Sequence, residues 1–182
     1  MTYSLVMRKI ISIFLLCFFL MQGFGQTQKK VSTYLFAQYT NTIYDITLGN
    51  NPWGAGLGLQ TFFNNKTNFK PTIELTGDLY LMDDKVGRAR ANGILIDDVP
   101  GMVNLFIGSS FQPAQNFYLS FTAGPSFIHG RTLLGIKPSL GFYFDTNQKW
   151  TGKFSYINVF NRDVETKEDF GSVSFAIGLK LF

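Results

Sequence analysis

Hydrophobic and polar residues alternate one by one along most of the chain beyond about residue 30. In the clearest segment, residues 69–81, every charged side chain falls on one set of alternate positions, and nearly all aliphatic side chains fall on the other. A β-strand directs successive side chains to opposite faces, so this segment is expected to have one apolar and one polar face. The pattern predicts a β-strand, and no stretch has the period of an amphipathic helix.

Eight segments are expected to form strands, and the first of them separates its two faces least clearly. They are residues 33–44, 55–64, 69–81, 102–112, 116–128, 136–145, 150–160 and 172–181. Three connections, at 64–68, 112–116 and 145–149, are short and have the composition of tight turns. The connections at 45–52, 82–101 and 161–169 are longer and more polar, and 129–133 is a short exception among them. This alternation predicts an antiparallel all-β protein whose short turns share one end.

Two kinds of barrel fit such strands. A soluble barrel places its apolar face inward and binds a small apolar ligand, whereas an outer-membrane barrel turns that face to lipid. The polar faces here consist mainly of Ser, Thr, Asn, Gln and Gly instead of the Lys and Glu of a solvated surface. Glycines fall mostly on these polar faces, as a narrow lumen requires: Gly56, Gly58, Gly108, Gly124, Gly141 and Gly178. The composition favours the membrane barrel, and the soluble barrel stays as an alternative.

Aromatic residues form two sets at the predicted strand ends. Phe63, Phe69, Phe111, Phe117, Phe144 and Trp150 lie beside the short turns. Tyr44, Trp53, Tyr80, Phe127, Phe160 and Phe170 lie beside the longer connections. Aromatic girdles flank the apolar band of transmembrane barrels at both interfaces, so these sets support a membrane-spanning barrel.

The first 25 residues are predicted to be a cleavable signal peptide. Arg8 and Lys9 precede the apolar run 10–21, and Gly23 and Gly25 supply a small-x-small cleavage site. The run is shorter than the roughly 20 residues of a spanning helix. Residues 26–182 would then form one barrel domain without cysteine, since Cys17 leaves with the signal. Cleavage also lowers the formal net charge from +4 to +2, which gives no support to a nucleic-acid partner.

Residues 31–182 resemble the small eight-stranded outer-membrane proteins of the OmpA/OmpX type. The resemblance rests on the signal peptide, the alternating strands, the short turns opposite long loops, and the terminal Phe182. It implies a closed, eight-stranded, antiparallel up-and-down transmembrane β-barrel in the bacterial outer membrane, with outer-membrane lipid around it and side chains filling its lumen. It also implies insertion by the outer-membrane barrel assembly machinery, which recognises a C-terminal aromatic. Here Leu179 and Leu181 are out of phase with Phe182, a departure from the usual pattern.

Charged residues on the predicted lumen face form the main candidate constellation. They are Lys70, Glu74, Asp78, Lys137, Lys153 and Lys180. Buried charges need partners, so we expect a lumenal ion-pair network. A proton or ion pathway is the alternative.

The longest connection is the candidate interaction loop, because binding residues concentrate in loops on rigid scaffolds. Its charged residues are Asp83, Asp84, Lys85, Arg88, Arg90, Asp97 and Asp98. A lipopolysaccharide headgroup or an extracellular or membrane protein would be its partner.

Enzymatic chemistry has little support in the sequence. Some barrels of this size modify lipid A acyl chains, but His129 is the single histidine, and Arg131 stands where the deacylase pattern needs serine. No cofactor or metal ligand set is evident, and residues 54–58 fit strand glycines better than a phosphate loop. The sequence predicts a non-enzymatic barrel, with a lipid-modifying barrel enzyme as the alternative.

Overall fold

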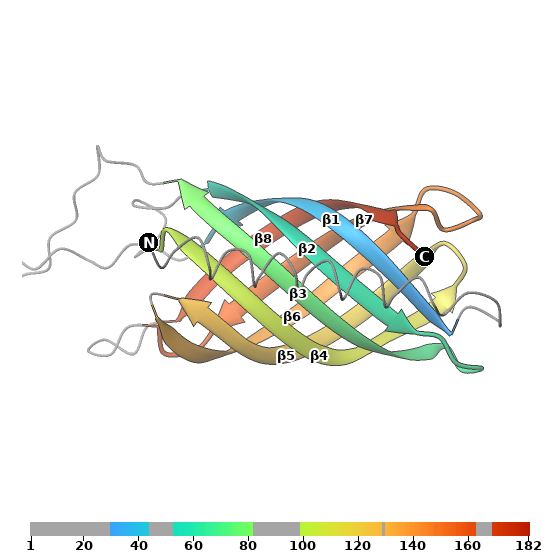
Figure 1. Ribbon diagram of the computed structural model, residues 1–182, viewed down its shortest axis with the longest axis horizontal. Coiled ribbons are helices and arrows are strands. Elements are labelled where there is room, and N and C mark those ends of the chain that lie inside the picture. The colour runs from blue at the N-terminus through green and yellow to red at the C-terminus, as the bar shows by residue number, and fades with distance from the viewer. Residues whose placement is uncertain (1–29, 44–52, 82–98, 129, 163–168) are drawn as a thin grey trace, which may run out of the picture. The chain divides into compact units, whose positions relative to one another are not determined.

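The computed structural model describes residues 30–43, 53–81, 99–128, 130–162 and 169–182. The predicted signal peptide therefore lies outside the described residues. Eight strands form a single closed barrel in sequence order (Figure 1). They are β1 (Val31–Thr42), β2 (Trp53–Phe63), β3 (Phe69–Leu81), β4 (Gly101–Ala114), β5 (Phe117–Ile128), β6 (Arg131–Tyr143), β7 (Trp150–Val159) and β8 (Phe170–Lys180). All neighbouring pairs are antiparallel, and β8 pairs with β1 to close the barrel. The predicted fold is confirmed.

The strand boundaries lie within two residues of the sequence prediction except at the start of β6, and the connection before β4 also differs. Strand β6 begins at Arg131, which pairs with Ile128, so the turn around Gly130 (φ 73°) is much tighter than expected. Val99, predicted to lie in the long loop, is fully buried, and the carbonyl oxygen of Pro100 accepts a hydrogen bond from the Tyr80 amide at 3.0 Å. The last residues of the predicted loop therefore belong to the barrel wall.

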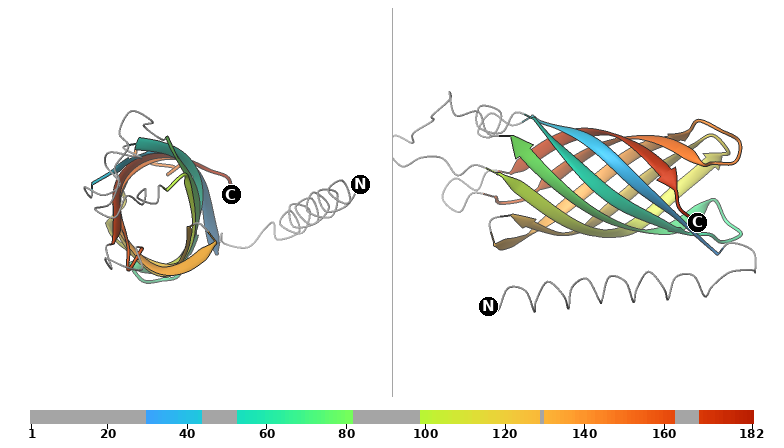
Figure 2. Two further views of the ribbon diagram at one scale, coloured as in Figure 1. Left: turned by 90° about the vertical axis from the view of Figure 1, so that its left-hand side faces the viewer. Right: turned by 45° about the horizontal axis from the view of Figure 1, so that its top comes forward.

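The two faces of the strands point as the membrane-barrel interpretation requires. Large apolar side chains cover the outside, including Leu57, Leu79, Ile107, Phe121 and Phe154, which are 54–72% exposed. The interior holds mainly polar side chains, and Figure 2 shows the strands surrounding this lumen at a tilt. A continuous apolar exterior is unfavourable in water but suits lipid. The soluble-barrel alternative is wrong, because its apolar face would have to point inward. Among the described residues, no helix is long and apolar enough to cross a membrane.

The aromatic girdle beside the short turns is confirmed. Phe69 stacks on Phe111 with ring centroids 4.7 Å apart, and Phe144 and Trp150 are exposed on the outer surface. The set predicted beside the long connections is partly wrong. Trp53 and Phe127 are exposed as expected, and Tyr44 lies outside the described residues.

Two members of that second set, Tyr80 and Phe170, are buried in the lumen instead. Tyr80 shares the phase of the inward-facing Glu74 and Asp78 on β3, so the alternation of the strand turns its ring inward. A position near a strand end does not by itself place an aromatic ring on the outer surface. The ring points inward or outward according to its place in the alternation of the strand.

Glycines on the lumen wall make room for flat aromatic rings on neighbouring strands. Tyr118 pairs with Gly141, and a Cβ added at Gly141 would overlap the Tyr118 ring. Phe36 pairs with Gly178, where an added Cβ would lie 2.5 Å from a ring carbon. Each ring therefore lies against the backbone of the adjacent strand, which a larger residue would prevent.

Gly141→Ala is expected to destabilise the barrel by about 1–3 kcal/mol, because the new methyl group must displace the fully buried Tyr118 ring. Urea unfolding in a defined lipid or detergent measures the change. Gly77→Ala is the matched control, because an added Cβ there meets nothing within 4 Å. Equal effects of the two substitutions would contradict this account.

Candidate functional site

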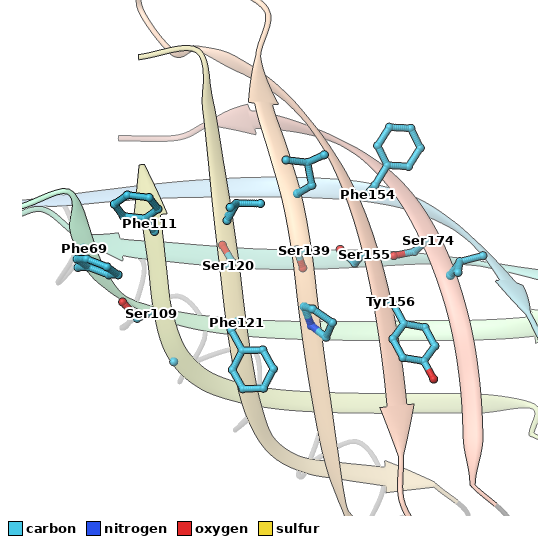
Figure 3. A pocket seen from close by; sticks show the side chains of 15 residues that line it. Phe69, Ser109, Phe111, Ser120, Phe121, Ser139, Phe154, Ser155, Tyr156 and Ser174 are labelled. Atoms are coloured by element: carbon cyan, nitrogen blue, oxygen red, sulfur yellow. The ribbon is translucent and has the colours of Figure 1, made fainter. Parts of the chain in front are cut away.

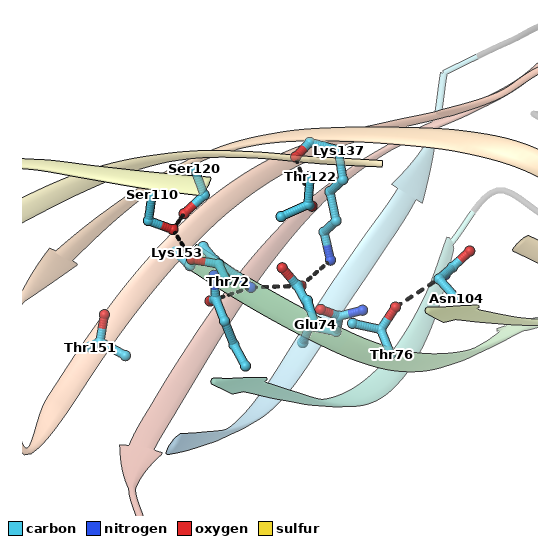
Figure 4. Close-up of polar contacts among 12 residues, drawn as sticks. Thr72, Glu74, Thr76, Asn104, Ser110, Ser120, Thr122, Lys137, Thr151 and Lys153 are labelled. Carbon is cyan, nitrogen blue, oxygen red and sulfur yellow. Dashed lines mark hydrogen bonds and ion pairs between the residues drawn. The ribbon is translucent and has the colours of Figure 1, made fainter. Parts of the chain in front are cut away.

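A buried carboxylate held between two lysines lies in the middle of the lumen. Oε1 of Glu74, on β3, is 2.7 Å from Nζ of Lys137 on β6 and 2.7 Å from Nζ of Lys153 on β7 (Figure 4). The three side chains are 1–3% exposed. Because β3 is not a neighbour of β6 or β7, these ion pairs join opposite walls of the barrel.

Amide groups from β1 and β2 and a second carboxylate on β3 extend this centre. Lys153 Nζ also donates to Gln60 Oε1 at 3.0 Å and lies 4.3 Å from the centroid of the Phe36 ring. Gln38 Nε2, on β1, donates to Asp78 Oδ1 at 2.6 Å. We call Glu74, Asp78, Lys137 and Lys153 the lumen charge cluster.

The composition of the lumen charge cluster explains how it can remain buried. It contains two acidic and two basic side chains, and Asp78 interacts electrostatically with both lysines. Removing a charge from water costs several kcal/mol unless partners compensate it. Two lysines beside Glu74 supply that compensation, and Gln38 satisfies one oxygen of Asp78.

The other two predicted network residues lie elsewhere in the lumen. Lys70 Nζ donates to Gln112 Oε1 at 2.5 Å, and Lys180 Nζ lies 6.0 Å from the centroid of the Tyr34 ring. Both lysines are close to the short-turn end of their strands. The structure thus divides the six predicted residues into a central cluster and a pair at one mouth.

A row of serines crosses five strands on the lumen face, and the sequence analysis missed it. Cross-strand pairing aligns Ser110, Ser120, Ser139, Ser155 and Ser174. Ser110 lies within hydrogen-bonding distance of Ser120 at 2.5 Å and of Thr72 at 2.7 Å. Each serine is visible as a polar-face residue of its own strand, but only the register between strands reveals the row.

On the outer surface of the same strands, the outward-pointing side chains leave an open groove. Figure 3 shows this groove from outside the barrel, with Ser120, Ser139, Ser155 and Ser174 along its middle. Phe111 and Phe154 lie on one side of these serines, and Phe121 and Tyr156 lie on the other. The groove lies on the apolar exterior of β3 to β8, so it faces lipid and not the lumen charge cluster.

Apolar layers lie on both sides of the lumen charge cluster. At the end of the longer connections, the layer consists of Tyr80, Val99, Met102, Phe106, Ile128, Ile157, Val159 and Phe170. At the short-turn end, it consists of Tyr34, Phe36, Phe62, Tyr118 and Ala176, with Tyr143 packed against it. The rings of Phe62 and Tyr118 meet edge to face, 5.2 Å apart. The charges are therefore enclosed between two packed layers.

Most of the remaining predicted site residues lie in segments that the structure does not describe. His129 and the charged residues of the candidate loop, from Asp83 to Asp98, lie outside the described residues. Residues 54–58 are strand β2, as expected. Within the described parts of the chain, no group of three His, Cys, Asp or Glu side chains could hold a metal ion.

Phe182, the predicted assembly signal, follows β8 directly. Its carbonyl oxygen accepts a hydrogen bond from the Thr33 amide at 3.1 Å, and its side chain is 38% exposed. The backbone pairing of β8 with β1 thus continues to Phe182, and recognition of this residue by the assembly machinery stays a prediction.

No family model matches the sequence, and no curated protein matches it. Among solved structures, it is similar to Ail, an outer membrane protein of Yersinia pestis. The structure of Ail in a phospholipid nanodisc has a TM-score of 0.52 and 11% identity, covering 82% of this chain and 99% of that chain. The crystal structure of Ail has a TM-score of 0.51 and 10% identity, covering 83% and 97%. Ail in complex with the heparin analogue sucrose octasulfate has a TM-score of 0.51 and 14% identity, with the same coverage.

The likeness to Ail shows the fold of a small outer-membrane β-barrel. The continuous apolar exterior independently requires a lipid environment for the described strands. Together, these observations make the chain a transmembrane β-barrel protein.

Glu74→Ala is expected to lower the free energy of unfolding by about 3–5 kcal/mol, because it removes the carboxylate that pairs directly with Lys137 and Lys153 and leaves Asp78 to balance both. Thermal and urea unfolding in detergent measure this loss. Replacing both lysines by Met and Asp78 by Asn in the Glu74→Ala background removes all four charges of the cluster and should recover most of it. An unchanged melting curve for Glu74→Ala would contradict the structural role.

Proposed function

We propose that the protein is a closed, non-enzymatic outer-membrane barrel with a structural or interaction role performed by its extracellular loops. One observation carries this proposal: the lumen charge cluster is enclosed between two packed apolar layers. Ion pairs that join opposite walls stiffen the barrel and hold Glu74, Lys137 and Lys153 in direct contacts with one another instead of leaving them free to carry ions. In an eight-stranded barrel, side chains are generally enough to fill the interior.

A lipid-modifying enzyme is the less favoured function. A catalytic His needs a nucleophile and an orienting group within hydrogen-bonding reach. The described residues around position 129 include Arg131, whose guanidinium donates to the backbone carbonyls of Asn161 and Arg162. This arginine ties two turns of the wall together, which is a structural use of the position where the deacylase pattern has serine.

The orientation of the barrel follows from the lengths of its connections. The turns after β2, β4 and β6 are short, whereas segments 44–52, 82–98 and 163–168 connect strands at the other end. Outer-membrane barrels generally have short periplasmic turns and longer extracellular loops. The segment that contains Asp83, Arg88 and Asp98 would then face the exterior.

The charge of these outer segments indicates what they would bind. Their sequences contain eight acidic and four basic residues. Ail binds the sulfated heparin analogue in its solved complex, but a net-acidic surface repels sulfated polyanions. A protein with a basic surface therefore fits these segments better than a polyanion does.

The enclosed lumen predicts that the purified barrel does not conduct ions in a planar lipid bilayer. Replacing Phe106 and Phe36 by Ala, one ring from each apolar layer, should give small, brief conductance steps, since each change removes a fully buried ring. Leu57→Ala, on the outer surface, is the control and should stay silent. Steady conductance of the unmodified protein would refute a closed barrel.

The proposed orientation predicts that an epitope inserted between Asn92 and Gly93 is labelled by antibody on intact cells. The same epitope inserted between Thr146 and Asn147, two exposed residues of the β6–β7 turn, should be labelled only after the outer membrane is permeabilised. Heat-modifiable gel migration verifies that both proteins are folded. The reverse labelling pattern would overturn the orientation and the extracellular role of the loop.

A further inference from the structure

Between Val31 and Phe182, four lysines lie at the short-turn end of the barrel. Lys66 lies in the β2–β3 turn and Lys149 in the β6–β7 turn, and both are exposed. Lys70 and Lys180 are partly buried at the lumen mouth of the same end. Lys149 and Lys180 are adjacent, because the Lys149 carbonyl accepts a hydrogen bond from the Lys180 amide at 2.8 Å. We call these four residues the basic arc.

Little negative charge opposes the basic arc. From Val31 to Phe182, the single acidic side chain of this end is Asp145. Its Oδ1 accepts hydrogen bonds from the backbone amides of Lys149 and Trp150, both at 2.9 Å. Asp145 therefore shapes the turn, and Lys70 and Lys180 repel each other electrostatically. Between Val31 and Phe182, this end therefore carries four basic side chains and one acidic side chain.

The basic arc occupies one side of the barrel rim. It runs from the β6–β7 turn across the end of β8 to the β2–β3 turn, and β8 and β1 are paired within it. The remaining connection at this end, residues 112–116 between β4 and β5, contains no charged residue. The positive charge is thus concentrated on one side of the rim.

Aromatic side chains fix the depth of the arc. Lys66 lies between Phe63 and Phe69 along the chain, and Lys149 is followed by Trp150; all three aromatic side chains are exposed on the outer surface. Exposed aromatic residues of a membrane barrel mark the headgroup level. Both exposed ammonium groups therefore lie where lipid phosphates are, and not far out in solution.

From this juxtaposition we infer that the basic arc binds the phosphates of anionic phospholipids in the leaflet at the short-turn end. In the orientation proposed above, this is the inner leaflet of the outer membrane. Lysine suits the task, because its ammonium is a mobile point charge that adapts to a fluid headgroup region. Binding would hold a patch of anionic lipid against β7, β8 and β2 and leave the β4–β5 side unoccupied.

The test compares the association of spin-labelled phosphatidylglycerol and phosphatidylcholine with the full mature chain in phosphatidylcholine vesicles at low ionic strength. The natural protein should prefer phosphatidylglycerol. Lys66→Gln and Lys149→Gln should each lower that preference by up to about fivefold. Gln115→Glu, which changes the net charge equally on the uncharged β4–β5 side, should have a much smaller effect. High salt should abolish the difference between the two lipids.

Three outcomes would overturn the inference. Equal association of both lipids with the natural protein excludes selectivity, and equal effects of all three substitutions make it a property of net charge alone. Stabilisation of the detergent-solubilised barrel by inorganic phosphate, with no lipid preference, would instead assign the arc to a soluble anion. The variants alter exposed turn residues, and heat-modifiable migration verifies their folding. Because the vesicle assay does not depend on orientation, its failure is separable from failure of the proposed function.

Discussion

The ion pairs from Glu74 to Lys137 and Lys153 are the interaction on which the arrangement of the lumen depends. An eight-stranded barrel whose outer face is apolar must turn its polar face inward, into a space too narrow to keep charged groups fully hydrated. Each ionised side chain there needs a partner on another strand. The ion pairs that compensate these charges across the lumen also fix the distance between its opposite walls. The same contacts therefore stabilise the buried charges and determine the width of the barrel.

The apolar layers follow from the same constraint. Charges that are paired in a low-dielectric space interact more strongly when water is kept away. Rings such as Phe106 on one side and Tyr118 on the other exclude water along the axis. They can lie flat against the wall only because residues such as Gly141 lack a side chain on the adjacent strand. The lumen glycines, the buried aromatic rings and the ion pairs therefore act together to fill a narrow polar interior.

Much of this fold could be predicted from the sequence, because alternation reports the face of each residue directly. Strand number, the direction of the apolar face and the lumen positions of Glu74 and Lys153 all follow from a period of two. The register between strands does not, because it is set by pairing across the whole sheet. Prediction from the sequence therefore put Lys70 in the same network as Glu74 and Tyr80 in a lipid-facing girdle, and it did not identify the serine row. The error at Tyr80 arose from using position along the strand in place of its phase.

The distribution of charge along the barrel axis connects the two proposals. The outer segments have an acidic excess in their sequences, the lumen charge cluster is balanced, and the short-turn end carries the lysines of the basic arc. A balanced centre adds no net charge to the membrane-spanning band, where net charge would be most costly. The excess charges therefore lie at the two ends, where water and headgroups solvate them. Under the two proposals, each end would select its surroundings by the sign of its charge, without disturbing the ion pairs that hold the wall.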